Sequence, residues 1–166
     1  MRLRNLLVTC AGVLGAVSCA SGPRPTVDSD ALPESRWIGS LQPTQQRSGA
    51  LVVTAKNHAF GSVAIVPLRG NTERMRLTLN VSVPSTTSTG LRWAVVPDRC
   101  GNGDLPLIGV DEFPLIEIGT DGRGSAQVDL PLQMAPNNGY HVNVYDGAAL
   151  LENVVTCANL KYEGRK

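Results

Sequence analysis

Aromatic side chains and an excess of charge of one sign are both scarce in this chain. Phe, Trp and Tyr make up 4% of the residues, and 15 Lys and Arg stand against 14 Asp and Glu. Binding to nucleic acid relies on a basic surface, and often on aromatic side chains that stack on bases. The composition provides neither, so we expect no nucleic-acid partner.

Histidine is scarcer still, since the chain contains only His58 and His141. Copper and zinc sites need three or four nitrogen or sulfur donors that converge on one point. The sequence also lacks a Gly-x-Ser-x-Gly motif, a Ser/His/Asp set, a phosphate-binding loop and a Cys-x-x-Cys pair. We therefore expect no catalytic residues, no metal ligands and no cofactor.

A sustained helical repeat is absent beyond the first 17 residues, whereas short alternating segments separated by turn residues are frequent. Met75, Leu77, Leu79 and Val81 alternate with polar residues, which is the period of a half-buried strand. Seventeen Gly and eleven Pro separate such segments. The strand candidates are 37–41, 49–54, 62–68, 75–83, 91–96, 125–130, 140–145 and 153–160. This pattern predicts an all-β, antiparallel sandwich or barrel, with 101–114 as its longest irregular loop.

The N-terminus has the layout of an export signal. A basic start with Arg2 and Arg4 precedes an apolar run, 6–17, that is too short for a permanent membrane span. The run ends in Gly15-Ala-Val-Ser-Cys19, which resembles a bacterial lipobox, and this resemblance implies cleavage before Cys19 and its acylation. The alternative is an ordinary signal peptide that is cut near Ala20. Loss of the two arginines would leave 13 basic against 14 acidic residues.

These features predict three regions. Residues 1–18 are a lipoprotein signal peptide, 19–35 a flexible tether rich in Ser, Pro and Asp, and 36–166 the β-sandwich domain. No Asp follows Cys19 directly, which in a Gram-negative cell resembles sorting to the outer membrane. We expect an exported protein of the cell envelope that is held on the membrane by its lipid.

Two of the four cysteines remain once Cys10 is cleaved off and Cys19 is acylated. Outside the cytoplasm, Cys100 and Cys157 are expected to oxidise to a disulfide. The closed loop of about 57 residues would stabilise the fold by about 4 kcal/mol. The alternative, a pair of free thiols that bind metal, has no further ligands nearby in the sequence.

The surroundings of these two cysteines resemble the Cu/Zn superoxide dismutase family, a Greek-key β-sandwich. There, a strand that opens with Gly leads into a long loop whose cysteine is bridged to the last strand. Gly90-Leu-Arg-Trp-Ala-Val-Val followed by Cys100-Gly, and Val155-Thr-Cys157-Ala-Asn-Leu160, look like those two places. The segments 113–115, 121–122 and 140–145 also resemble bacterial lipoproteins related to this sandwich and to chordin-type (CHRD) domains.

The metal ligands of that family have no counterparts in this chain. A dismutase carries a His-x-His pair before the loop, where this chain has Trp93-Ala-Val-Val-Pro-Asp98. The loop offers only Asp104, Asp111 and Glu112, and the last copper ligand would fall near Asn143 or Tyr145. The positions of the anion-guiding arginine hold 153–156, which contain no arginine. Dismutase activity is therefore not expected.

Two weaker candidate sites remain. His141, Asn143 and Tyr145 share one face of a strand and form a speculative ligand patch; the alternative is a solvated sheet face with Val142 and Val144 packed inside. An acidic set in the loop resembles a calcium site only loosely, because its spacing fits no known calcium loop, and the alternative is a solvated acidic loop. That set comprises Asp98, Asp104, Asp111 and Glu112. His58 is expected to be solvated.

The sequence thus predicts a non-catalytic, lipid-anchored envelope or surface protein that serves as a binding or structural module. Its expected partners are the membrane, through the lipid on Cys19, and an unidentified envelope or extracellular ligand. The first alternative is a lipoprotein that binds a metal or a small ligand. The second is a degenerate superoxide dismutase.

Overall fold

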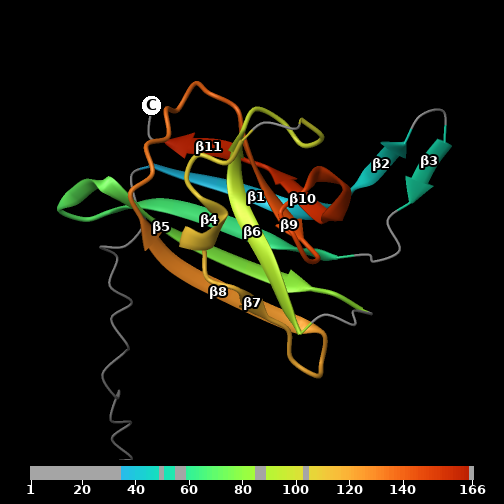
Figure 1. The fold of residues 1–166 in the computed structure, drawn as a ribbon. Helices are drawn as coiled ribbons and strands as arrows, with labels where there is room; N and C mark the ends of the chain where they lie inside the picture. The colour runs from blue at the N-terminus through green and yellow to red at the C-terminus, as the bar shows by residue number, and fades with distance from the viewer. Residues whose placement is uncertain (1–34, 49–50, 55–58, 85–88, 103–104, 165–166) are drawn as a thin grey trace, which may run out of the picture. The chain divides into compact units, whose positions relative to one another are not determined.

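The described part of the chain begins at Ser35. The computed structural model describes residues 35–48, 51–54, 59–84, 89–102 and 105–164 (Figure 1). The predicted signal peptide, Cys19 and residues 20–34 of the predicted tether lie outside this part, as do His58 and Asp104. No helix within the described residues is long and apolar enough to span a membrane.

The expected all-β architecture is confirmed for the described residues. Every strand pair is antiparallel, and the helical elements of this part are the 3₁₀ turns η2 (Val110–Glu112) and η3 (Leu151–Asn153). The strands are β1 (Ser35–Pro43), β2 (Gln45–Ser48), β3 (Leu51–Thr54), β4 (Phe60–Leu68), β5 (Asn71–Ser82), β6 (Gly90–Pro97), β7 (Ile116–Glu117), β8 (Arg123–Leu130), β9 (Tyr140–Tyr145), β10 (Val154–Asn159) and β11 (Lys161–Gly164).

One nearly closed sheet contains nine of these strands. Its order is β7-β6-β9-β10-β1-β4-β5-β8, with β11 paired to β1, while β2 and β3 form a separate two-stranded sheet. β1 joins the two halves, because residues 35–41 pair with β11 and β4, and residues 42–43 pair with β10 (Figure 1). The two ends of the order, β7 and β8, also lie beside each other.

A single hydrophobic core fills the inside of this sheet. Met75, Leu77, Leu79 and Val81 of β5 are buried and alternate with polar residues, as the period-two pattern predicts. Trp93 of β6 and the valines of β9 belong to the same buried cluster. Burial of each large apolar side chain contributes about 1.5–3 kcal/mol, so this core is the main source of stability.

The structure differs from the predicted strands mainly at short elements. The expected last strand over 153–160 is divided: η3 precedes it, β10 ends at Asn159, and β11 follows after Leu160, whose amide donates to the carbonyl of Tyr140 (2.8 Å). The strands β2, β7 and β11 were not predicted. The expected irregular loop at 101–114 contains η2, and the first strand begins one residue before the predicted domain boundary at residue 36.

Candidate functional site

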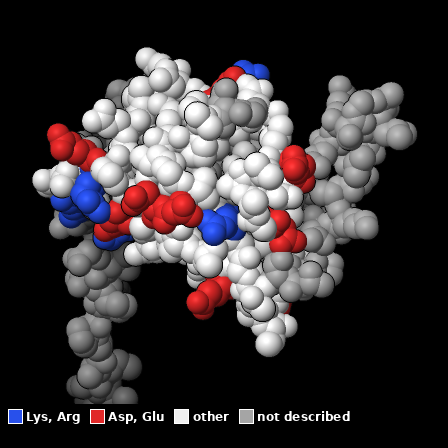
Figure 2. Space-filling view, viewed as in Figure 1, with Lys and Arg blue, Asp and Glu red and all other residues white. Residues whose placement is uncertain are grey.

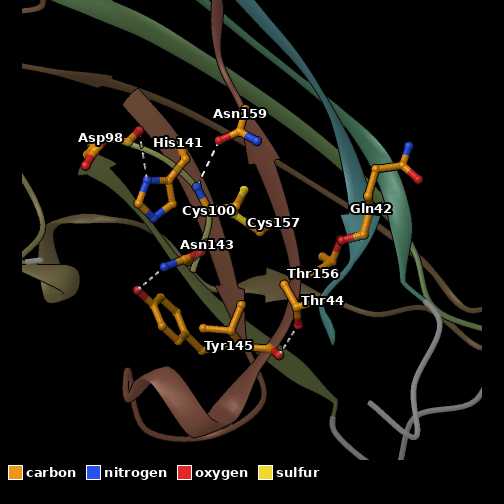
Figure 3. The surroundings of a disulfide bond; sticks show 11 residues. Gln42, Thr44, Asp98, Cys100, His141, Asn143, Tyr145, Thr156, Cys157 and Asn159 are labelled. Carbon is orange, nitrogen blue, oxygen red and sulfur yellow. Dashed lines mark hydrogen bonds between the residues drawn. A yellow bond between two sulfur atoms is a disulfide. The ribbon is translucent and has the colours of Figure 1, made fainter. Parts of the chain in front are cut away.

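The predicted disulfide between Cys100 and Cys157 is present. Its sulfur atoms are 2.01 Å apart and its Cα atoms 6.0 Å apart (Figure 3). The amide of Cys100 also donates to Oδ1 of Asn159 (2.9 Å). Asp98, two residues earlier, has a positive φ of 64°, and its amide donates to the carbonyl of Gly139 (2.9 Å). The loop after β6 is thus attached covalently and by hydrogen bonds to β10 and to the residue before β9.

The disulfide lies on the face of the sheet opposite Val142 and Val144, here called the outer face, although Cys157 is itself buried. Strand register places Asn143 directly between Ala94 of β6 and Cys157 of β10. In the same way His141 lies between Val96 and Asn159, and Tyr145 lies opposite Arg92. Side chains at paired positions share one face of a sheet. The three residues of the speculative ligand patch therefore form one row beside the disulfide.

The row is buried, so the expectation of a solvated sheet face is wrong. The exposed fractions of His141, Asn143 and Tyr145 are 0%, 3% and 4%. Val142 and Val144 do pack inside, as expected, so β9 is buried on both faces. A strand can be covered on both sides only where another segment lies over its outer face.

That segment comprises residues 98–114, here called the cover, of which 103–104 are not described. At one end, the carbonyl of Asp98 accepts a hydrogen bond from Nδ1 of His141 (3.2 Å), so this nitrogen carries the proton. At the other end, Asp111 forms an ion pair of 2.7 Å with Arg92, the register partner of Tyr145. Between them the amide of Leu107 donates to the carbonyl of Val95 (2.9 Å). The cover therefore runs along the row from His141 to Tyr145.

The end of the cover also contacts the core. Nε1 of Trp93 donates to the carbonyl of Pro114 (2.7 Å), and the ring of Phe113 packs edge-on against Trp93 with centroids 5.0 Å apart. Both rings are buried. These two contacts pack the end of the cover, just before β7, against Trp93 of β6.

Two of the buried polar groups of the row are hydrogen-bonded to each other. Nδ2 of Asn143 donates to the hydroxyl of Tyr145 (3.3 Å; Figure 3). Burial raises the pKa of the Tyr145 phenol above its ordinary value, and the bond from Asn143 offsets part of this shift. A buried donor that has a hydrogen-bond partner lowers the stability of the fold little, whereas a buried donor without a partner lowers it by about 1–3 kcal/mol. The hydrogen bonds of the row are therefore those expected of a structural element that is buried under the cover.

The described acidic residues of the cover do not form a cation site. Asp111 is committed to Arg92, and the carboxylate of Asp98 accepts a hydrogen bond from the side chain of Asn102. Across the described residues, no three His, Cys, Asp or Glu side chains lie close enough to hold one metal ion. On the face seen in Figure 2, acidic and basic side chains lie close to one another and much of the surface is uncharged.

A different part of the sheet has an open hollow that the sequence did not indicate. Its volume is about 750 Å³, and it lies over β5, β8 and the turn between β7 and β8. The polar residues that line it are Asn80, Ser82, Glu117, Asp121, Arg123 and Ser125. Their sequence signal is weak, because alternating polar residues on a strand look like any solvated sheet face.

Fold and site together define an all-β domain with one disulfide-held cover and one open polar hollow. Comparison with protein-family models, with curated proteins and with solved structures finds no match for this chain.

Proposed function

We propose that this chain is a non-catalytic, lipid-anchored envelope protein whose domain is a superoxide dismutase-like β-sandwich that acts as a binding or structural module. The lipobox-like segment before Cys19 supports the anchor and the exported location. The disulfide supports export as well, because such bonds persist mainly in oxidising compartments.

The strand order supports a Greek-key sandwich. The chain leaves β5 for the other half of the sheet, forms β6 and β7 there, and returns to pair β8 with β5. Return of a later strand to the side of an earlier one is the defining move of a Greek key. Cu/Zn superoxide dismutase shares the sandwich architecture, and the resemblance around the two cysteines points to the same family.

The observation that carries the non-catalytic role is the covered outer face of β6 and β9. Where the resemblance calls for imidazole ligands, Ala94 and Val96 present methyl groups, and the polar row of β9 is buried and hydrogen-bonded under the cover. A catalytic metal needs converging donors and one open coordination position. This face offers a packed surface in place of both.

Anchoring is tested by expressing the full chain in an exporting bacterial host that is fed an alkynyl fatty acid. The wild type should incorporate the label and fractionate with membranes, and the variant Cys19→Ser should do neither. A variant that still carries label, or a wild type without it, would overturn the anchored arrangement.

The non-catalytic role is tested on the same membrane-extracted protein. Its copper and zinc content should be far below one ion per chain, and superoxide turnover should stay at the buffer rate when copper is added. Stoichiometric metal would favour the metal-binding alternative, and copper-dependent turnover would favour a degenerate dismutase. Either result would contradict the proposal.

A further inference from the structure

The open hollow lies on the outer face of the half-sheet formed by β4, β5 and β8. Register places Phe60, Ser82 and Arg123 in one row across these strands. The next row on the same face contains Asn80 opposite Ser125. Neighbouring strands lie about 4.8 Å apart, so these rows form a platform about 10 Å wide.

β7 can approach β8 closely because Gly124, the register partner of the buried Val81, has no side chain. A Cβ on Gly124 would lie 2.6 Å from the carbonyl oxygen of Glu117, too close for any real side chain. β7 and the residues after it can therefore come close to β8, which brings Glu117 to the rim of the hollow. The turn is held by the amide of Gly119, which donates to the carbonyl of Arg123 (2.8 Å), and by Oδ1 of Asp121, which accepts from the amide of Arg123 (3.1 Å).

Apart from Asp121, the polar side chains of the hollow make no hydrogen bond or ion pair within the described residues. Asn80, Ser82 and Ser125 make no side-chain hydrogen bond there, whereas the comparable Asn143 on the covered face does. Glu117 and Arg123 form no ion pair within the same residues, although Arg36, Arg76 and Arg92 do. Donors and acceptors are thus available together at one place on rigid strands.

The charge and the apolar surface of the hollow narrow the ligand class. Glu117 and Asp121 outnumber the single cation of Arg123, so the charged groups of the hollow sum to −1 and disfavour an anionic ligand. The amide and the two hydroxyls both donate and accept. Phe60, 45% exposed, stands in the row beside Ser82 and offers a flat apolar surface. The electron-rich face of an aromatic ring attracts polarised C–H bonds, and such bonds line the faces of a sugar ring.

We propose that this hollow, together with Phe60 in the row beside it, binds a neutral oligosaccharide, with Phe60 under one face of a sugar ring and Asn80, Ser82 and Ser125 bonded to its hydroxyls. The proposal rests on the binding role proposed above but is independent of the lipid anchor. A volume of about 750 Å³ lies within the range of ligand sites, roughly 300–1,000 Å³. Because the hollow is open, only one side of the ligand is desolvated, and we expect a Kd on the order of 0.1–1 mM.

The experiment is a titration of the ¹⁵N-labelled, exported protein with chitotetraose and with cellotetraose, followed by NMR. At least one sugar should shift the amide signals of 80–82 and 117–125 saturably, and Phe60→Ala and Asn80→Ala should each weaken binding at least fivefold. Gln127→Ala is the matched polar control, because Gln127 is exposed on the same face of β8 and does not line the hollow. Leu150→Ala is the matched apolar control, because Leu150 is 51% exposed and does not line the hollow.

Three results would overturn the proposal. These are the absence of a saturable shift with either sugar, shifts that Phe60→Ala and Asn80→Ala leave unchanged, and binding of inorganic phosphate in preference to both sugars. All substituted residues are exposed, and the unperturbed signals of β9 report that each variant is folded. Acylation and metal content are measured separately, so a failure here is distinguishable from a failure of the proposed anchored, non-catalytic role.

Discussion

The two outer faces of the same sheet differ in solvent exposure. Over β6, β9 and β10 the cover lies on the face, and Asn143 and Tyr145 are buried within it. Over β4, β5 and β8 nothing in the described chain covers the face, and Asn80 and Arg123 point to solvent. β9 and β5 both carry polar residues at alternate positions, so the difference between these two strands arises from the cover that lies over β9.

This comparison shows how one fold separates structure from binding. A polar face that is covered must satisfy its own hydrogen bonds and is then unavailable to ligands. A polar face that is left open keeps its donors and acceptors for a partner. In this chain the face that the family resemblance would mark as the site is the covered one, and the open hollow is at the other half of the sheet.

Removal of the disulfide should reduce the difference between the covered and the open face more than any other change. We expect Cys100→Ser/Cys157→Ser to lose about 4 kcal/mol of unfolding free energy, because the unfolded chain regains the entropy of a loop of about 57 residues. Denaturant unfolding measures this loss, and hydrogen exchange should show faster opening of β9 than of β5. A hollow of about 470 Å³ lined by both cysteines gives a reductant access to the bond.

Reduction of the wild type by a dithiol should therefore reproduce the loss, while the double variant should not respond to the dithiol. Equal stability of the oxidised wild type and the double variant would show that the cover is held by its other contacts alone.

A matched pair of asparagines sharpens the comparison. Asn143→Ala should destabilise the fold by about 1–3 kcal/mol, because it removes the bond to the Tyr145 hydroxyl and leaves that buried group unsatisfied. Asn80→Ala, on the open face, should change stability by less than about 0.5 kcal/mol. Chemical denaturation of both variants measures the difference, and similar losses would contradict the assignment of one face as covered and the other as open.

The smallest expected effect is a pH dependence from Tyr145. Burial raises the pKa of its phenol, so the folded protein keeps the proton where the unfolded chain loses it. This stabilisation is fully present below the unfolded pKa of about 10 and is lost as pH rises through the folded value. The unfolding free energy of the wild type should fall more steeply above pH 10 than that of Tyr145→Phe. Parallel pH profiles would indicate that the phenol is solvated.

Local pattern was enough to predict the long strands and the disulfide. The alternation 75–83 places β5, the segment 140–145 coincides with β9, and the predicted cleavage of Cys10 and acylation of Cys19 leave Cys100 and Cys157 for the disulfide that the structure contains. The strands β2, β7 and β11 were missed because two to four residues are too few to establish a period.

The sites could not be predicted for a different reason. Whether His141 is exposed or buried depends on where residues 98–114 lie. The sequence around His141 does not indicate the position of that segment. Likewise the hollow depends on register between three strands and on the approach of Glu117 to Gly124. Both are contacts between segments far apart in the chain, which local periodicity does not report.

The position of β1 has a mechanical consequence. Residues 35–38 of this strand pair with β11 and residues 37–41 pair with β4, so residues 37–38 are paired on both sides, and Trp37 packs against Tyr162 with ring centroids 4.9 Å apart. A pull on the chain ahead of Ser35 would act along the strand, so several bonds on both sides would have to shear together before it could move. A domain held at its N-terminus by a membrane anchor would thus be loaded at one of its best-supported strands.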